Sequence, residues 1–182
     1  MSTFSARMAA MTTSIPPSAS TAAAAETTPA PRWLDDDEAL AWRAWVDLNA
    51  QLSARLNREL QAASGLSLSD YEILVALTDP DVPDGALRMF ELGERLQWEK
   101  SRVSKQVSRM EARGLVERRH CADDRRGAFV QLTEAGMAAI AAAAPGHVAL
   151  VRELFFEGLD EEQVRSLGRF ATTVLGRLAA ES

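Results

Sequence analysis

Basic side chains are gathered in one short part of this chain of 182 residues. Between Arg95 and Arg126 there are 10 Lys and Arg residues against 5 Asp and Glu residues. The whole chain has 20 against 26, so the remainder has 10 against 21. An acidic protein that gathers its positive charge in one place has a surface suited to a polyanion. The distribution therefore predicts phosphate recognition as the chemistry of this stretch.

A helix that begins near Glu99 would sort its side chains into three stripes. One stripe is apolar and is spaced to pack on Leu92 and Leu96 of a preceding helix: Val103, Val107 and Met110. The opposite stripe carries hydroxyl groups and a lysine: Ser101, Ser104, Lys105 and Ser108. The third stripe is mostly arginine: Arg102, Gln106, Arg109 and Arg113. This sorting is typical of a helix that is half buried in a fold and half buried in a groove.

Short hydroxyl side chains let a helix backbone approach base edges, so the second stripe favours the major groove of double-stranded DNA. Lys105 can reach the O6 and N7 atoms of a guanine, a contact worth roughly 1–3 kcal/mol of discrimination. The arginines are better placed for phosphates, which position a protein without specifying sequence. We predict DNA contacts from these residues: Lys100, Ser101, Arg102, Ser104, Lys105, Ser108, Arg109 and Arg113. The alternative is a solvated amphipathic helix that binds nothing.

A basic β-hairpin is predicted to follow this helix. Residues 115–121 and 128–132 alternate well enough for two strands, and the turn between them contains Asp124, Arg125 and Arg126. The negative potential of a DNA minor groove favours an inserted arginine, and Asp124 can brace Arg126 through a charge-assisted hydrogen bond. We predict DNA contacts from all three turn residues. The alternative is a charged turn that only keeps the hairpin soluble.

Helices are predicted on both sides of these elements. An apolar stripe indicates a long first helix from near Trp33 to Gly65: Trp45, Leu48, Leu52, Leu56 and Leu60. Ser69 and Glu72 have the capping-box spacing for a second helix, which the two prolines of residues 79–85 end. Residues 86–89 are compatible with a short strand, and two helices are expected within residues 91–113.

The C-terminal part is also predicted to be helical. Thr133 can cap a fifth helix, which Pro145 and Gly146 are expected to kink or interrupt. A last helix from Asp160 to about Leu178 has one apolar face: Val164, Leu167, Phe170, Val174 and Leu178. The terminal helices carry more apolar surface than a small domain needs for its own core, which indicates a homodimer.

These elements predict a mainly α fold with a small β-hairpin. We expect a disordered tail at residues 1–31, a winged helix–turn–helix domain at 69–133, and a helical dimerisation region at 32–68 and 134–182. The apolar stretches are shorter than the roughly 20 residues of a membrane span, so no membrane partner is expected. The single cysteine, Cys121, excludes an internal disulfide and fits a reducing cytoplasm. We expect neither a metal site nor a cofactor.

The sequence resembles the MarR family of bacterial winged helix–turn–helix transcription regulators over about residues 33–180. The most specific part is the wing signature Asp124-x-Arg126-x-x-x-Val130-x-Leu132-Thr133 followed by Gly136. The resemblance implies that residues 99–113 are the recognition helix. It also implies that Arg126 is the minor-groove arginine with Asp124 as its partner, and that the terminal helices interlock with those of a second subunit.

The resemblance further implies control by a small aromatic or phenolic effector bound between the dimer helices and the winged domain. Trp42, Trp45 and Tyr71 are candidate lining residues, although aromatic residues at such spacings are more often part of a core. A redox role for Cys121 is an alternative form of control, against an incidental strand cysteine. His120 and Arg119 beside it would favour the thiolate.

We therefore predict a sequence-specific regulator, a repressor, that binds double-stranded DNA as a cytoplasmic homodimer. Two recognition helices about one DNA turn apart, roughly 34–36 Å, predict an inverted-repeat operator. The alternative is a winged-helix module that binds protein, which the acidic remainder of the chain keeps open. An enzyme is disfavoured because only His120 and His147 are available and no nucleophile elbow, phosphate loop or H-E-x-x-H spacing occurs.

Overall fold

The computed structural model describes residues 32–120 and 128–180. The expected tail at residues 1–31 and the expected hairpin turn lie outside this range, and so do Cys121, Asp124, Arg125 and Arg126. The described chain is mainly helical with one three-stranded sheet, which confirms the predicted fold class.

The long first helix is α1 (Asp36–Ser64). It begins with a capping box, in which Glu38 N donates to Asp35 Oδ1 at 2.9 Å and Asp35 N donates to Glu38 Oε2 at 3.0 Å. It ends at Gly65, as predicted, where a φ of 68° is the left-handed conformation that favours glycine. Two short sequence signals thus fix both ends of this helix.

The second helix, α2 (Leu68–Thr78), begins two residues earlier than predicted. Its capping box is formed by Ser67 and Asp70, with Asp70 N donating to Ser67 Oγ at 3.1 Å and Ser67 N donating to Asp70 Oδ2 at 2.8 Å. The sequence holds two overlapping boxes, and tertiary contacts select the first. Leu68 N donates to Asn57 Oδ1 of α1 at 2.9 Å, which anchors the first turn at this register.

The winged part consists of a small sheet and two helices. After a turn at Pro83–Gly85 come β1 (Ala86–Arg88), α3 (Met89–Leu96), α4 (Lys100–Ala112), β2 (Val116–His120) and β3 (Ala128–Leu132). The sheet is antiparallel with the order β1-β3-β2, so the predicted short strand adds a third strand to the hairpin. Helix α3 begins at Met89 rather than residue 91, because Glu91 caps it by accepting from Arg88 N at 2.8 Å.

One core joins α2, the helix–turn–helix and the sheet. The predicted inner stripe of α4 is confirmed, since Val103, Val107 and Met110 are buried and Leu92 of α3 is buried against them. The same core contains buried residues of α2 and of both hairpin strands: Ile73, Leu74, Leu77, Val116 and Val130. The core therefore fixes the outward direction of the remaining α4 side chains.

Helix α5 (Glu134–Val151) begins where predicted, with Gly136 N donating to Thr133 Oγ1 at 3.0 Å. Thr133 Oγ1 also donates to Leu115 O at 3.0 Å, so the helix start lies directly on the turn after α4. A Cβ at Gly136 would overlap that carbonyl oxygen. Glycine is required there by the close approach of two backbones.

Pro145 and Gly146 were predicted to kink or interrupt this helix; the helix is not interrupted, because α5 continues through both residues. A proline within a helix costs about 3 kcal/mol, and the packing of α5 offsets it. Ile140 and Ala143 are buried in the core, and α5 contacts α1 and α2. Beyond Val151 the helix widens into the π-helical turn Arg152–Phe156, and α6 (Glu161–Ala180) follows.

The segment Glu134–Phe156 is long and apolar enough to cross a membrane by length and composition, with a mean hydropathy of 1.3. No such segment was expected from the sequence, because Pro145, Gly146 and His147 interrupt the apolar run. A helix packed in a globular core meets the same criterion. Only 17% of that window is buried in the single chain, although Ile140 and Ala143 belong to the core described above, so length and composition alone are weak evidence of a membrane span.

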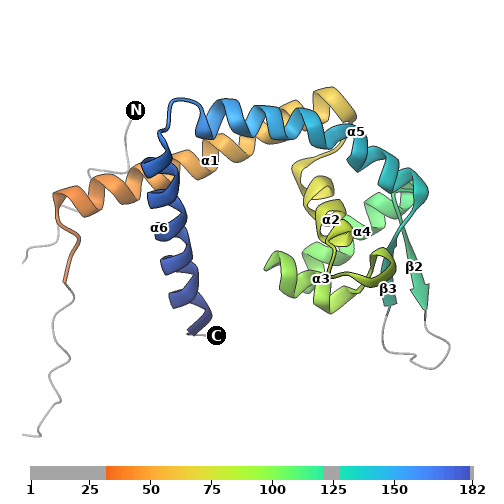
Figure 1. The fold of residues 1–182 in the computed structure, drawn as a ribbon. Coiled ribbons are helices and arrows are strands. Elements are labelled where there is room, and N and C mark those ends of the chain that lie inside the picture. Colours follow the sequence, from red (N-terminus) through yellow and green to blue (C-terminus); the bar gives the residue numbers. More distant parts are fainter. Residues whose placement is uncertain (1–31, 121–127, 181–182) are drawn as a thin grey trace, which may run out of the picture.

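Helices α1 and α5 run side by side above the winged part, and α6 descends separately from the other end of this pair (Figure 1). Large apolar residues on α1 and α6 are exposed, among them Leu40, Trp42, Val46, Phe170, Leu175 and Leu178. Helix α6 has no buried residue. The two parts of the molecule thus differ in whether the chain covers its own apolar surface.

Candidate nucleic-acid interface

The outer face of α4 presents basic side chains without partners. Lys100, Lys105 and Arg109 are exposed, and no ion pair or hydrogen bond to their side chains occurs within residues 32–120 and 128–180. All three side chains are therefore exposed, as predicted. Cations that are not neutralised by neighbouring carboxylates are available to an external anion.

The serine stripe of α4 lies partly against strand β2. Arg118 donates through Nη2 to Ser104 O at 3.0 Å and to Ser108 Oγ at 2.6 Å, and its Nε lies 3.7 Å from Glu111 Oε2. Arg118 is not among the residues that were predicted to contact DNA. The alternation of side chains along β2 could have indicated this position, because Arg118 pairs in register with buried Val130 and thus points to the inner face of the sheet.

Arg102 is held at the start of α4 by the preceding turn. Its guanidinium lies over the Trp98 ring, 3.7 Å from the ring centroid, an arrangement that a cation–π interaction stabilises. Burial raises the pKa of Glu72 on α2, and the positive charge of Arg102 opposes that shift. Trp98 therefore limits the directions that Arg102 can take on the surface.

Arg113, predicted to contact phosphate, ties α4 to the junction of α1 and α2 in the single chain. Its Nη1 donates to Asp70 Oδ2 at 2.7 Å and its Nη2 donates to Gly65 O at 2.9 Å. Gln106 Nε2 donates to the other carboxylate oxygen, Asp70 Oδ1, at 2.7 Å. Periodicity along one helix could not predict this role, because Asp70 is 36 and 43 positions away from its two partners.

Asp70 is 2% exposed, the one buried charged residue among those the structure describes. Burial by itself would raise the pKa of its carboxyl group. The Ser67 N–H, the Arg113 guanidinium and the Ser67 hydroxyl outweigh burial and lower that pKa below its ordinary value. Asp70 is therefore ionised near neutral pH and holds α4 at a fixed position relative to α1 and α2.

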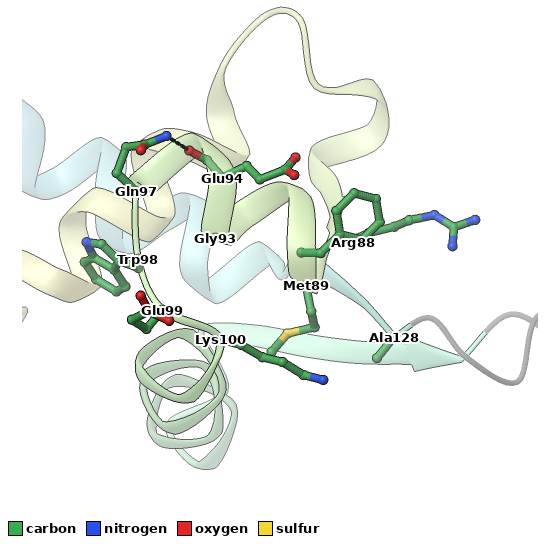
Figure 2. A pocket seen from close by; sticks show the side chains of 10 residues that line it. Arg88, Met89, Gly93, Glu94, Gln97, Trp98, Glu99, Lys100 and Ala128 are labelled. Carbon is green, nitrogen blue, oxygen red and sulfur yellow. Dashed lines mark hydrogen bonds between the residues drawn. The ribbon is translucent and has the colours of Figure 1, made fainter. Parts of the chain in front are cut away.

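A hollow of about 500 Å³ lies between α3, the start of α4 and the start of β3. Its lining includes Arg88, Phe90, Glu94, Lys100 and Ala128. In Figure 2 the Lys100 and Arg88 side chains both extend toward the side of the hollow where β3 begins. The Arg88 guanidinium lies 4.9 Å from the centroid of the Phe129 ring on β3. The hollow thus adjoins the basic face of α4 on one side and the hairpin on the other.

Comparisons with known proteins agree with this arrangement. Residues 64–127 match a model of the MarR family. The crystal structure of AbsC, a MarR family transcriptional regulator from Streptomyces coelicolor, is 39% identical in sequence with a TM-score of 0.75. That match covers 82% of this chain and 99% of AbsC.

The chain belongs to the MarR family. This membership confirms the resemblance seen in the sequence, and it makes the protein a transcriptional regulator rather than an enzyme.

Two further relatives are similar to this MarR-family protein. Sco3205 from Streptomyces coelicolor, a MarR family transcriptional regulator solved in complex with DNA, is 38% identical with a TM-score of 0.76, over 81% of this chain and 91% of Sco3205. The HTH-type transcriptional repressor YetL of Bacillus subtilis (strain 168) is 29% identical over 123 residues, which are 64% of this chain and 72% of YetL.

The candidate effector residues of this MarR-family protein lie in separate contacts. Trp45 meets Phe170 of α6 edge-on at 6.0 Å between ring centroids, whereas Tyr71 stacks on His147 of α5 at 4.4 Å. Trp42 is exposed. A hollow of about 440 Å³ between α1 and α5 is lined by His147 and several alanines, and by none of the three predicted residues.

The described part of the chain contains no group of three or more His, Cys, Asp and Glu side chains placed to hold a metal ion. Asp124 and Arg126, the hairpin-turn residues of the MarR-family signature, lie outside the described residues, so their roles remain predictions.

Proposed function

We propose that this protein is a repressor that binds an inverted-repeat operator in double-stranded DNA as a homodimer in the cytoplasm. The observation that carries this proposal is the set of exposed, unneutralised cations along α4, which the core holds facing outward. The relative Sco3205 was solved with DNA, and YetL is named a repressor. DNA contacts are proposed for Lys100, Ser101, Arg102, Ser104, Lys105, Ser108 and Arg109, and for Asp124, Arg125 and Arg126 at the hairpin turn.

The apolar residues of α1 and α6 support the homodimer. Side chains as large as Trp42, Phe170 and Leu175 are exposed in the single chain and would be covered by the same helices of a second copy. A two-fold pair would present two α4 helices to successive major grooves of one duplex, which requires an operator with inverted half-sites.

A small aromatic or phenolic effector is proposed to release the DNA. The Tyr71–His147 stack joins α2 of the winged part to α5, so a ligand that displaces this contact would act on both parts. An effector shifts DNA affinity only if it binds the two conformations differently. Trp42 and Trp45 are the remaining proposed lining residues, and tryptophan fluorescence during titration with candidate aromatic compounds tests this.

The proposed function is tested by measuring the affinity for a labelled duplex from the region upstream of the protein's own gene, over a series of salt concentrations. Wild type should bind with an affinity that falls steeply with salt. Arg109→Ala should reduce the magnitude of the salt slope by about 1, and Lys105→Ala should relax base preference at one operator position.

Arg55→Ala serves as the control, because Arg55 lies on α1 and pairs with Glu59 at 3.1 Å. It should bind as wild type does, whereas Arg126→Ala extends the test to the hairpin turn. If the wild-type protein does not bind this duplex at low salt, the proposal is refuted, and the alternative of a winged module that binds protein is favoured.

A further inference from the structure

A polar cluster at the junction of α1 and α2 holds α4 at two points. Both oxygens of the Asp70 carboxylate are used, since Gln106 Nε2 donates to Oδ1 and Arg113 Nη1 donates to Oδ2, each at 2.7 Å. Gln106 and Arg113 are seven residues apart, nearly two full turns, so both lie on one side of the helix. Arg113 Nη2 also donates at 2.9 Å to the backbone oxygen of Gly65, where α1 ends.

These contacts restrict α4 in a way that its apolar contacts do not. The inner stripe of α4, formed by Val103, Val107 and Met110, is buried in the core, and apolar contact is non-directional. The hydrogen bonds to the Asp70 carboxylate are directional and involve a charged group, and burial of that carboxylate strengthens them. The cluster therefore fixes both the rotation of α4 about its axis and its position along that axis.

The same junction leads to the proposed dimer surface. Helix α1 ends at Gly65, and it carries exposed apolar residues such as Leu40 and Trp42 that a second copy is proposed to cover. Helix α4 is proposed to read one half-site of the operator. The position of α4 relative to the end of α1 therefore contributes to the distance and angle between the two α4 helices of the proposed dimer.

We propose that Asp70, Gln106 and Arg113 are positioning residues that determine how strictly the homodimer selects the spacing of the two operator half-sites. The inference rests on the proposed function, and it assigns specificity to residues outside the set proposed to contact DNA. One added base pair moves a half-site by about 3.4 Å along the duplex and turns it by about 34–36°, since one turn contains 10–10.5 base pairs. Two rigidly held helices cannot follow both changes, whereas helices released from the junction can follow part of them.

Loss of the cluster has a different signature from loss of a phosphate contact. A released α4 loses affinity at the natural spacing, because it must be ordered on binding, and keeps more of its affinity at an altered spacing. The ratio of the two dissociation constants therefore falls. A lost phosphate contact would weaken binding at every spacing equally and reduce the magnitude of the salt slope by about 1. Partial unfolding leaves the ratio unchanged, because it lowers both apparent affinities by the same factor.

The test first locates the half-sites by footprinting on the duplex from the region upstream of the protein's own gene. The same half-sites are then placed at the natural spacing, one base pair closer and one base pair farther apart. Wild type should bind the two altered duplexes at least about tenfold more weakly than the natural one. In Arg113→Met and in Gln106→Leu this difference should fall to about threefold or less, with an unchanged salt slope. Both variants keep the Ser67–Asp70 capping box of α2.

Each variant has a matched control within the winged part. Arg95→Met breaks the ion pair of Arg95 Nη1 with Asp79 Oδ2 at 2.9 Å, which joins α3 to the residue after α2. Gln131→Leu removes an amide of β3 whose Nε2 donates to Asp84 O at 3.5 Å. Neither change touches the junction of α1 and α2, so both controls should keep the wild-type ratio. Thermal melting shows whether each variant is folded.

A folded Arg113→Met or Gln106→Leu protein that keeps the wild-type ratio overturns the inference, and so does a wild-type protein that does not distinguish the three spacings. A uniform loss of affinity with a smaller salt slope in Arg113→Met also overturns it and assigns Arg113 to a phosphate contact. If wild type binds no duplex at low salt, the proposed function itself has failed.

Discussion

The winged part buries its large apolar residues, whereas the helices α1 and α6 leave many of theirs exposed. In the winged part, Leu92, Val107 and Met110 are completely buried within one chain. On α6, Phe170 and Leu175 remain more than half exposed, and no residue of this helix is buried. The winged part is thus stabilised by burying its apolar surface within one chain, whereas the apolar surface of α6 stays in contact with water. The winged part buries its apolar residues within one chain, whereas the exposed apolar surface of α1 and α6 supports the proposal that a second copy covers it.

The strongest test of this contrast is Phe170→Asp. A charge in the proposed dimer surface should yield a monomer, and loss of the second α4 should weaken operator binding by at least about a hundredfold. Sedimentation and operator titration measure the two effects. Thr172→Asp is the control, because Thr172 lies on the opposite side of α6 and should leave the dimer intact. A dimeric Phe170→Asp protein with normal affinity would contradict the proposed surface.

A pair of leucine truncations compares the two regions directly. Leu92 is 0% exposed and Leu175 is 64% exposed. In the monomeric Phe170→Asp background, Leu92→Ala should lower the free energy of unfolding by about 3 kcal/mol, because it leaves a cavity. Leu175→Ala should change it by less than about 0.5 kcal/mol. Urea denaturation measures both. Equal losses would mean that α6 packs within its own chain.

The contact that holds α4 at the junction of α1 and α2 is tested by Arg113→Met. This change leaves the Asp70 carboxylate buried without its cation. The loss should be about 2 kcal/mol, below that for a fully buried pair, because 42% of the Arg113 side chain is exposed to solvent screening. Asp70 has a lowered pKa in the fold, so its contribution is present above the unfolded pKa of about 3.8 and is lost as pH falls through the folded value.

Urea denaturation at several acidic pH values follows this loss. Asp70→Asn should remove the carboxylate's pH dependence, whereas Arg113→Lys keeps the charge and should lose less stability than Arg113→Met. A stability of Arg113→Met equal to that of wild type would show that the pair does not hold α4 at the junction of α1 and α2.

The smallest expected effect concerns His147. Burial lowers its pKa from the ordinary 6.5, and its buried Nδ1 has no hydrogen-bond partner among the described residues. The unfolded chain therefore binds more protons below pH 6.5, and stability should fall as pH decreases through that window toward the folded pKa. His147→Phe keeps a ring against Tyr71 and should remove this dependence. Thermal melting between pH 5 and 7 measures it, and an unchanged pH profile in His147→Phe would assign the effect to another group.

Local sequence signals were sufficient for most of the elements. Gly65 ends α1 and Thr133 begins α5 because a left-handed turn and an oxygen cap depend on a few adjacent residues. The inner stripe of α4 followed from helical periodicity alone. The start of α2 did not, because Ser67 and Ser69 both have the capping-box spacing, and contacts with distant residues, such as that of Leu68 N with Asn57, separate the two positions.

The continuity of α5 likewise could not be predicted from local sequence signals. A proline predicts a break from local geometry, but the packing of Ile140 and Ala143 against distant elements maintains the helix. Among the candidate site residues, Lys100, Lys105 and Arg109 could be placed outward from the sequence because exposure depends on one helix face. Arg113 could not, because the carboxylate that it binds is carried by another helix.

The sequence by itself determined the family, the helix–turn–helix and the side of α4 that carries positive charge, since all of these depend on residue type and short-range spacing. Only the tertiary structure decided which of those charged groups are neutralised within the protein. Arg113 and Arg118 are held by partners on α2 and α4, and Arg102 lies over Trp98. The physical reason is that an ion pair or ring contact needs two groups within a few ångströms, and the fold brings together residues that are far apart along the chain.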